Sequence, residues 1–90
     1  MRAARVDRNQ ADIVDALKRA GVTVQHLHSV GGGCPDIIAG VRGVNYLIEI
    51  KHPKDGSLTI PQVKWHSDWK GQVHIACSEE DALRIVGLKT

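Results

Sequence analysis

The feature that most constrains this chain is a pair of short apolar runs separated by a glycine-containing turn. The runs cover residues 37–39 and 46–48, and Gly-Val-Arg-Gly at 40–43 stands between them. Two such runs flanking a turn of this composition are typical of a β-hairpin. We therefore expect two paired strands here, each at least half buried, around which the rest of the chain is arranged.

Three charged residues stand at the ends of this predicted hairpin. Asp36 opens the first strand, and Glu49 and Lys51 close the second. Side chains two residues apart in a strand share a face, so Glu49 and Lys51 project together. Antiparallel pairing about the turn would place Asp36 beside both of them. Because gathering these charges at an apolar edge costs desolvation energy, the pattern indicates a functional site. An ion pair between Glu49 and Lys51 at a sheet end is the structural alternative.

Hydrophobic periodicity and capping signals predict five further elements. The resulting order is helix, three strands, helix, strand, helix. A crossover through the second helix permits a parallel last strand, so we predict one α/β domain over residues 1–90, with a four-stranded mixed sheet flanked by helices. The five elements are a helix capped by Asp7 and ending at Gly21, a strand at 22–27, a helix capped by Thr59 and ending at Lys70-Gly71, a strand at 72–77, and a helix capped by Ser78.

Two glutamines have both a structural and a functional interpretation. Gln10 would complete a capping box with Asp7, and Gln62 would complete one with Thr59. Each glutamine also shares a helix face with large apolar residues, where it would border the hairpin site. Both interpretations stay open for both residues.

The quoted residues resemble a known signature. Pro35-Asp36, followed by Glu49-Ile50-Lys51 at the end of the next strand, is similar to the motif of the PD-(D/E)XK nuclease superfamily. A Leu-Thr-x-x-Gln stretch at 58–62 and the order of elements extend the resemblance from about residue 9 to about residue 83. The chain looks like the small stand-alone VRR-NUC and phage-type nucleases, which are Holliday-junction-resolvase-like. This resemblance implies a restriction-endonuclease-like αβββαβ core.

The resemblance also implies roles for individual residues. Asp36 and Glu49 would hold Mg²⁺ or Mn²⁺, joined by the backbone carbonyl of Ile50. Lys51 would orient the attacking water and counter the charge that builds on the phosphate. Gln10 and Gln62 would border this site. In many family members a glutamate on the first helix is a further metal ligand, and the first helix predicted here contains none.

The function implied is that of a metal-dependent, structure-specific DNA endonuclease acting on branched or Holliday-type junctions. A 90-residue subunit offers little surface for reading base sequence, and a C2 homodimer would present two sites to two strands, so we expect a homodimer. Two alternatives are a flap-cleaving or nicking nuclease of repair or phage replication, and a catalytically decayed DNA-binding module. The expected phosphate contacts are Arg2, Arg5, Lys54 and Lys64, with His52 beside them.

Composition narrows the expected partners. The net charge of +2 is compatible with DNA binding without indicating it. Aromatic residues make up only 3% of the chain and phenylalanine is absent, so base stacking is not expected to dominate binding. Trp65 and Trp69 are expected to pack. No apolar run approaches the ~18 residues of a membrane span, which favours a soluble, cytoplasmic protein of a bacterial or phage-infected cell with no membrane partner.

Two cysteines, Cys34 and Cys77, are too few and too far apart in the sequence for a disulfide framework. We expect both to be small buried residues. His26 and His28 share a strand face near Cys34, but without a fourth ligand at suitable spacing they are expected to be plain strand-end histidines rather than a zinc site.

Overall fold

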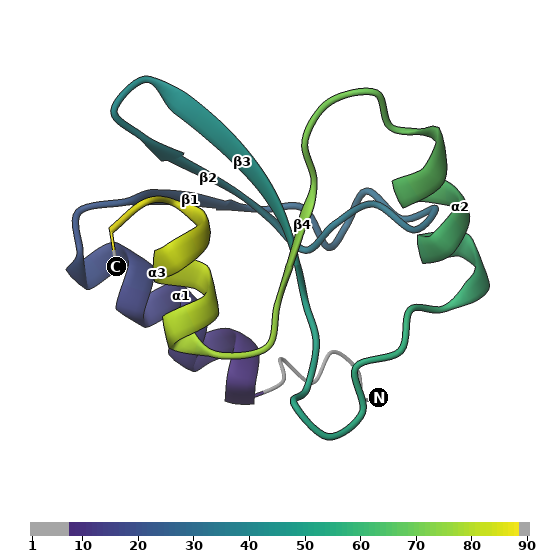
Figure 1. The fold of residues 1–90 in the computed structure, drawn as a ribbon, viewed down its shortest axis with the longest axis horizontal. Helices are drawn as coiled ribbons and strands as arrows, with labels where there is room; N and C mark the ends of the chain where they lie inside the picture. Colours follow the sequence, from purple (N-terminus) through teal and green to yellow (C-terminus); the bar gives the residue numbers. More distant parts are fainter. Residues whose placement is uncertain (1–7, 89–90) are drawn as a thin grey trace.

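The computed structural model describes residues 8–88, and the elements in this range follow the predicted order (Figure 1). Asp7, Arg2 and Arg5 lie outside the described residues, so the expected first cap and basic arm do too. The helices are α1 (Arg8–Arg19), α2 (Ile60–Asp68) and α3 (Glu79–Ile85), and the strands are β1 (Thr23–His26), β2 (Ile37–Val41), β3 (Val44–Ile50) and β4 (His74–Ala76).

The four strands form one sheet in the order β1-β2-β3-β4. The pairs β1–β2 and β2–β3 are antiparallel and β3–β4 is parallel, which confirms the predicted mixed sheet. In the hairpin, Ile37 pairs with Ile48 and the ladder ends at Val41 and Val44. Arg42 and Gly43 make the turn with φ angles of 51° and 77°, the left-handed backbone typical of a tight hairpin whose twist matches its strands.

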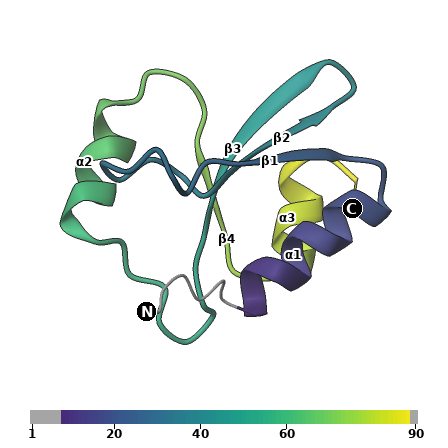
Figure 2. The ribbon, with the colours of Figure 1, turned by 180° about the vertical axis from the view of Figure 1, so that it is seen from behind.

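Helices α1 and α3 lie side by side against one face of the sheet, whereas α2 stands apart from both (Figures 1 and 2). The core is formed by the apolar faces of α1 and α3 and by alternate strand residues, among them Ile13, Leu17, Ile37, Ile48 and Val86. Because side chains alternate along a strand, the neighbours of Ile37 and Ile48 face away from this core. No helix within residues 8–88 combines the length and the apolar character needed to span a bilayer.

Helix α2 is held by its N-terminal turn and not by the core. The predicted capping box is present: the Gln62 backbone N–H donates to Thr59 Oγ1, and the Thr59 backbone N–H donates to Gln62 Oε1. No residue of α2 is buried. The start of the helix packs on Gly33, where an added Cβ would lie 2.3 Å from the Pro61 carbonyl oxygen. The side of the sheet opposite α1 and α3 is therefore where α2 meets the strands.

Two packing expectations need correction. Trp65 and Trp69 stack on one another, with ring centroids 4.6 Å apart, rather than entering the core, because the helix that carries them does not reach it. Cys34 and Cys77 are free and only partly buried, because both lie outside the strands, Cys34 in the loop before β2 and Cys77 directly after β4.

Candidate active site

The carboxylates of Asp36 and Glu49 meet at the open end of the hairpin. The β2–β3 register pairs Ile37 with Ile48, so one step further along the ladder Asp36 stands opposite Glu49. Asp36 Oδ2 accepts a hydrogen bond of 2.7 Å from the Ile50 backbone N–H, which holds the carboxylate against β3. The predicted meeting of the two acids across the ladder is thus present.

Glu49 is the only charged residue among those described that is fully buried, with 1% of its surface exposed. Burial, and next the charge of the Asp36 carboxylate, raise its pKa from 4.5 to about 8, against the opposing effect of Lys51. Among residues 8–88, no N–H or O–H group donates to the buried Glu49 Oε1, and side-chain hydrogen bonding with Asp36 favours the protonated form of Glu49. A buried carboxylate oxygen left unpaired is costly, so this atom marks a place where a ligand would be stabilising.

Lys51 completes the group on the same face. Its Nζ lies 3.6 Å from Glu49 Oε2, too far for a good hydrogen bond, and donates instead to Gln62 Oε1 at 2.6 Å. The side-chain amide of Gln62 donates in turn to Glu49 Oε2 at 3.0 Å. The ion-pair alternative is therefore present only as a long contact, and the amide of Gln62 bridges the two charges.

Gln62 satisfies both of its predicted interpretations at once. Its Oε1 accepts from the Thr59 backbone N–H at 2.9 Å as part of the capping box and also accepts from Lys51. Capping fixes the side chain at the first turn of α2, and that turn lies over the site. Because the capping box already holds the Gln62 side chain, its contacts to Lys51 and Glu49 fix the orientation of both groups.

Asn9 is a residue at the site that sequence reasoning missed. Its Nδ2 donates to the backbone carbonyl of Lys51 at 2.9 Å and to that of Cys77 at 3.1 Å, so it ties α1 to the ends of β3 and β4. Asn9 lies four residues before Ile13 and eight before Leu17, a spacing that places it on the inward side of α1 and could have identified it from the sequence. The side chain of Gln10, one position later, is half-buried and makes no hydrogen bond within residues 8–88.

His66 is a second missed residue, four positions after Gln62 and hence on the same side of α2. Within the described range its Nε2 is buried without a hydrogen-bond partner. Burial, followed by the positive charge of Lys51, lowers the pKa of His66. The imidazole therefore lies near the Lys51 ammonium and favours its neutral form.

The residues present fit a hard divalent cation. Mg²⁺ is commonly held by one or two carboxylates, with waters and substrate oxygens filling the other positions. Asp36 and Glu49 supply two adjacent carboxylates, one with an unpartnered oxygen, and the Ile50 backbone lies directly against Asp36. Within residues 8–88, no group of three or more His, Cys, Asp or Glu side chains is placed to hold one metal ion together, so an ion here would take its remaining ligands from backbone, water or substrate.

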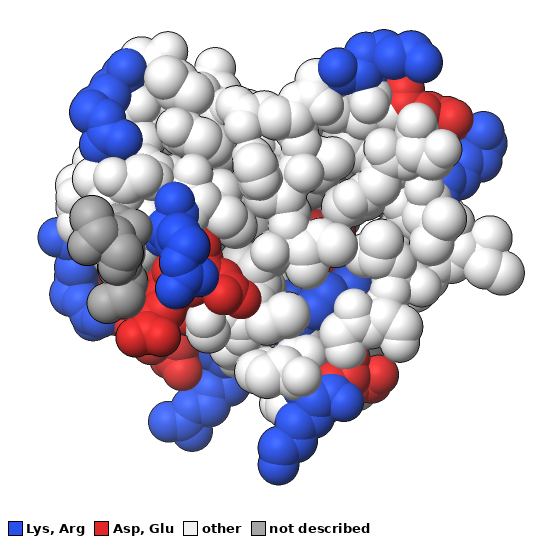
Figure 3. Space-filling model, in the orientation of Figure 1, with Lys and Arg blue, Asp and Glu red and all other residues white. Residues whose placement is uncertain are grey.

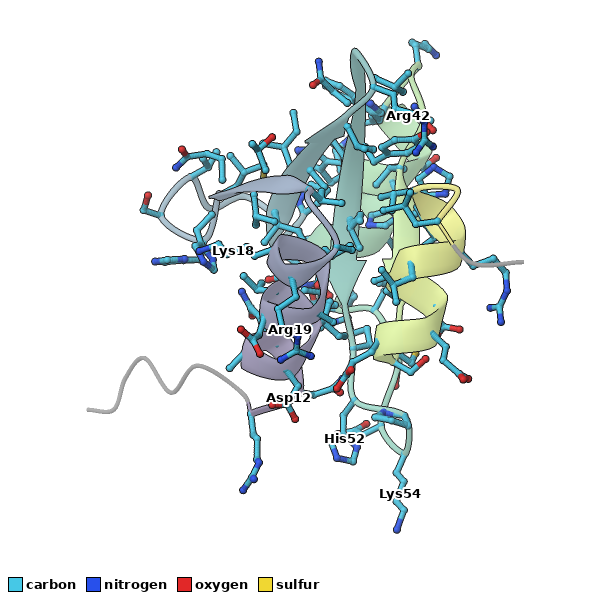
Figure 4. The ribbon with its side chains drawn as sticks, turned by 90° about the vertical axis from the view of Figure 1, so that its left-hand side faces the viewer. Asp12, Lys18, Arg19, Arg42, His52 and Lys54 are labelled. Atoms are coloured by element: carbon cyan, nitrogen blue, oxygen red, sulfur yellow. The ribbon has the colours of Figure 1, made fainter. Side chains whose placement is uncertain are left out.

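The predicted peripheral cations are spread over the surface. Figure 3 shows basic side chains projecting from several margins of the molecule, with basic and acidic atoms in a depression near the middle of the same face. Lys54 extends outward from the loop after β3, with His52 beside it (Figure 4). Lys64 is paired with Asp68 at 2.8 Å, which offsets its charge. Arg42 is committed elsewhere, donating to the Val86 carbonyl.

The fold has a solved counterpart. No protein-family model matches the sequence, and no curated protein matches it either. A solved structure described as a VRR_NUC domain aligns with 88% of this chain and 90% of its own, with a TM-score of 0.71 and 20% sequence identity. The chain therefore has a VRR_NUC-type fold, as its resemblance to PD-(D/E)XK nucleases predicted.

Proposed function

We propose that this domain is a divalent-cation-dependent endonuclease that hydrolyses phosphodiester bonds in DNA. One observation carries the proposal: Asp36, Glu49 and Lys51 gather on one face of the sheet, with a buried oxygen of Glu49 left unpartnered beside a second carboxylate. The similarity of the fold to a VRR_NUC domain supports the same conclusion. A site built only for stability would pair both oxygens of a buried carboxylate.

The roles we assign follow from the contacts. Asp36 and Glu49, with the Ile50 carbonyl, would hold Mg²⁺ or Mn²⁺. Such an ion, when bound, supplies Lewis acidity toward the phosphate and lowers the pKa of a bound water. The Lys51 ammonium, aimed by Gln62, would orient the attacking water and offset negative charge on the phosphoryl oxygens as a P–O bond of the backbone breaks. Gln10 remains a predicted border residue of this site.

We propose branched DNA, including Holliday-type junctions, as the substrate class, cleaved by a homodimer. The small size of the domain supports this, because 90 residues offer little surface for reading base sequence. A twofold axis relating two copies would place two sites against two strands of opposite direction. A flap-cleaving or nicking nuclease is the neighbouring alternative, and it requires only one site.

A non-catalytic DNA-binding module is the second candidate. The observation that favours it is Asn9, because the α1 side chain that reaches the ends of β3 and β4 is an uncharged amide used for backbone contacts. It supplies no further carboxylate for a second ion. Under this alternative the domain binds DNA and leaves it uncut with either metal.

The test is a cleavage assay on junction, flap and fully paired duplex DNA with Mg²⁺ or Mn²⁺. We expect the native protein to cut the branched substrates, and we expect Asp36→Asn and Lys51→Ala to be folded and inactive. Asp15→Asn is a matched control, because Asp15 is an exposed acid on α1, away from the site. Binding without cutting by the native protein would favour the DNA-binding module, and light scattering would establish whether the active species is a dimer.

A further inference from the structure

Helix α2 presents an aromatic surface that the fold does not use. Trp65 and Trp69 are nearly parallel, with an interplanar angle of 18° and centroids 4.6 Å apart. Trp69 is 45% exposed and Ile60, at the start of the same helix, is 86% exposed. Leaving this much aromatic and aliphatic surface in water is unfavourable, and exposed apolar surface of this kind marks interaction sites.

This surface is hollowed. A cavity of about 460 Å³ is lined by Ile60, Pro61, Trp65 and Trp69, together with Gly32 and the ion-paired Lys64 and Asp68. Its volume falls within the roughly 300–1,000 Å³ typical of sites for small organic ligands. A flat aromatic group entering it would meet indole on one side and leave its polar edge facing solvent and Lys64.

The Trp69 end of the aromatic wall is held by the chain that follows α2. An added Cβ on Gly71 would lie 2.9 Å from Trp69 Nε1, so the chain after α2 already runs directly against the indole. The capping box fixes the other end of the helix. The tryptophan pair is thus a preformed surface whose side-chain entropy is already reduced, which lowers the cost of binding.

The hollow adjoins the candidate active site through neighbouring residues of α2 and of the glycine loop. Gln62, which contacts Glu49 and Lys51, precedes Trp65 by three residues, a rise of about 4.5 Å along the helix. Gly33, against which Pro61 packs, lies just before Pro35-Asp36. The same two segments, α2 and the glycine loop, therefore border both the hollow and the carboxylates.

We propose that this hollow takes one unpaired nucleobase of the DNA substrate, stacked on the Trp65–Trp69 pair, while an adjacent phosphate lies at Asp36 and Glu49. This inference rests on the proposed nuclease function and adds how a branched substrate is distinguished from a duplex. A base in a continuous duplex is stacked on both sides and is not available, whereas a base at a flap or branch point is. Stacking on aromatic side chains is tolerant of base identity, so the preference is for DNA structure.

Location and charge bear on which occupant the hollow takes. Lys64 and Asp68 both line it and are paired with each other at 2.8 Å, so the lining is close to neutral and suits a neutral base rather than a phosphate. The hollow borders the glycine loop that leads to Asp36. A base held there would keep its own phosphate near the carboxylates, whereas a second copy of the chain would cover that approach.

The experiment measures binding in EDTA, so that it does not depend on cutting. The probes are two DNAs that carry 2-aminopurine at the same position of one strand: a flap in which it is the first unpaired base, and a fully paired duplex. We expect native protein to quench the unpaired probe and to bind the flap more tightly. Trp69→Ala should weaken flap binding by about 5- to 150-fold, the range expected for loss of one base–aromatic contact, and leave duplex binding unchanged.

Three further variants separate the possible outcomes. Trp69→Phe should restore much of the flap binding, and Ile60→Ser, at a side chain 86% exposed, should weaken it without affecting folding. Val63→Ala, which removes exposed apolar surface outside the hollow, should change nothing. Unaltered flap binding in both Trp69→Ala and Ile60→Ser would overturn the proposal. A change in mass by light scattering in those variants, with DNA binding intact, would assign the surface to a second copy.

Failure of this inference and failure of the nuclease assignment give different results. Loss of base recognition in Trp69→Ala is measured without metal and needs no cleavage. Loss of cutting in Lys51→Ala with flap binding retained would support the nuclease site. It would not bear on the hollow, which the binding of Trp69→Ala tests separately.

Discussion

Lys51 and Gln62 are joined by a hydrogen bond of 2.6 Å between Nζ and Oε1, linking the end of β3 to the first turn of α2. The same glutamine donates to Glu49 at 3.0 Å and caps its own helix. No residue of α2 is buried, so this amide is a principal connection between the helix and the sheet. The orientation of Lys51 and Glu49 and part of the anchoring of α2 therefore depend on one side chain.

Replacing Gln62 should separate these two roles. Gln62→Ala is expected to lower the cleavage rate by about 10- to 100-fold, as loss of a residue that orients active groups typically does. It should also cost about 1 kcal/mol of unfolding free energy through the lost cap. Thr59→Ala removes the cap but leaves the contacts to Lys51 and Glu49, so it should show only the loss of stability. Equal cleavage rates for the two variants in a single-turnover assay would contradict the assignment.

Glu49 should make the metal-free protein less stable as the pH rises. Its pKa is 4.5 in its ordinary state and about 8 here, so the folded protein holds a proton that the unfolded chain has released. The stabilisation is complete below about pH 4.5 and is lost as the pH rises through about 8. Urea unfolding in EDTA across this window should show the decline in native protein and a flatter profile in Glu49→Gln. Parallel profiles for the two proteins would count against the raised pKa.

Gly33 should be intolerant of a side chain. Its φ is +86°, and an added Cβ would lie 2.3 Å from the Pro61 carbonyl oxygen. Gly33→Ala must therefore shift α2, and we expect a loss of about 1–3 kcal/mol in stability together with reduced cleavage. Gly31→Ala is the matched control, because φ is +79° there but nothing lies within 4 Å of the added Cβ. The difference between the two in denaturant unfolding isolates the contact with Pro61, and equal losses would argue against it.

The hairpin could be predicted from the sequence in detail. Alternation of apolar and charged residues from Ile48 to Lys51 places Glu49 and Lys51 on one face, and the turn at Arg42-Gly43 sets the register that brings Asp36 opposite Glu49. These are local effects, because period and turn length decide them. For β4, the sequence showed only that parallel pairing was possible, since a crossover of this length allows either direction.

Residues on the helices could not be placed with the same certainty. Helical phase says which side chains share a face but not what the helix lies against, so Trp65 and Trp69 were expected to pack and instead stack at the surface. Asn9 and Gln10 both flank the apolar face of α1 and are both half-buried, so helical phase alone does not show which of them reaches the sheet. Only the three-dimensional arrangement shows that Asn9 meets the ends of β3 and β4.

Asn9 and Gln10 should therefore differ on substitution. Asn9→Ala leaves the carbonyls of Lys51 and Cys77 without their shared donor, and we expect it to cost about 1–3 kcal/mol and to impair cleavage by loosening the end of β3. Gln10→Ala should alter stability by less than about 0.5 kcal/mol. Thermal unfolding and cleavage measured on both variants test this. A larger loss of activity in Gln10→Ala than in Asn9→Ala would place Gln10 at the site instead.

Binding of Mn²⁺ in the absence of DNA tests the central claim most directly, because it asks only whether Asp36 and Glu49 hold a cation. Titration followed by electron paramagnetic resonance should show saturable binding by the native protein and by the control Asp15→Asn. Asp36→Asn and Glu49→Gln should each weaken Mn²⁺ binding by more than about 100-fold. That exceeds the loss of about 10- to 100-fold that is typical when a residue hydrogen-bonded to a metal ligand is removed. Binding by both variants that matches the native protein would contradict the account.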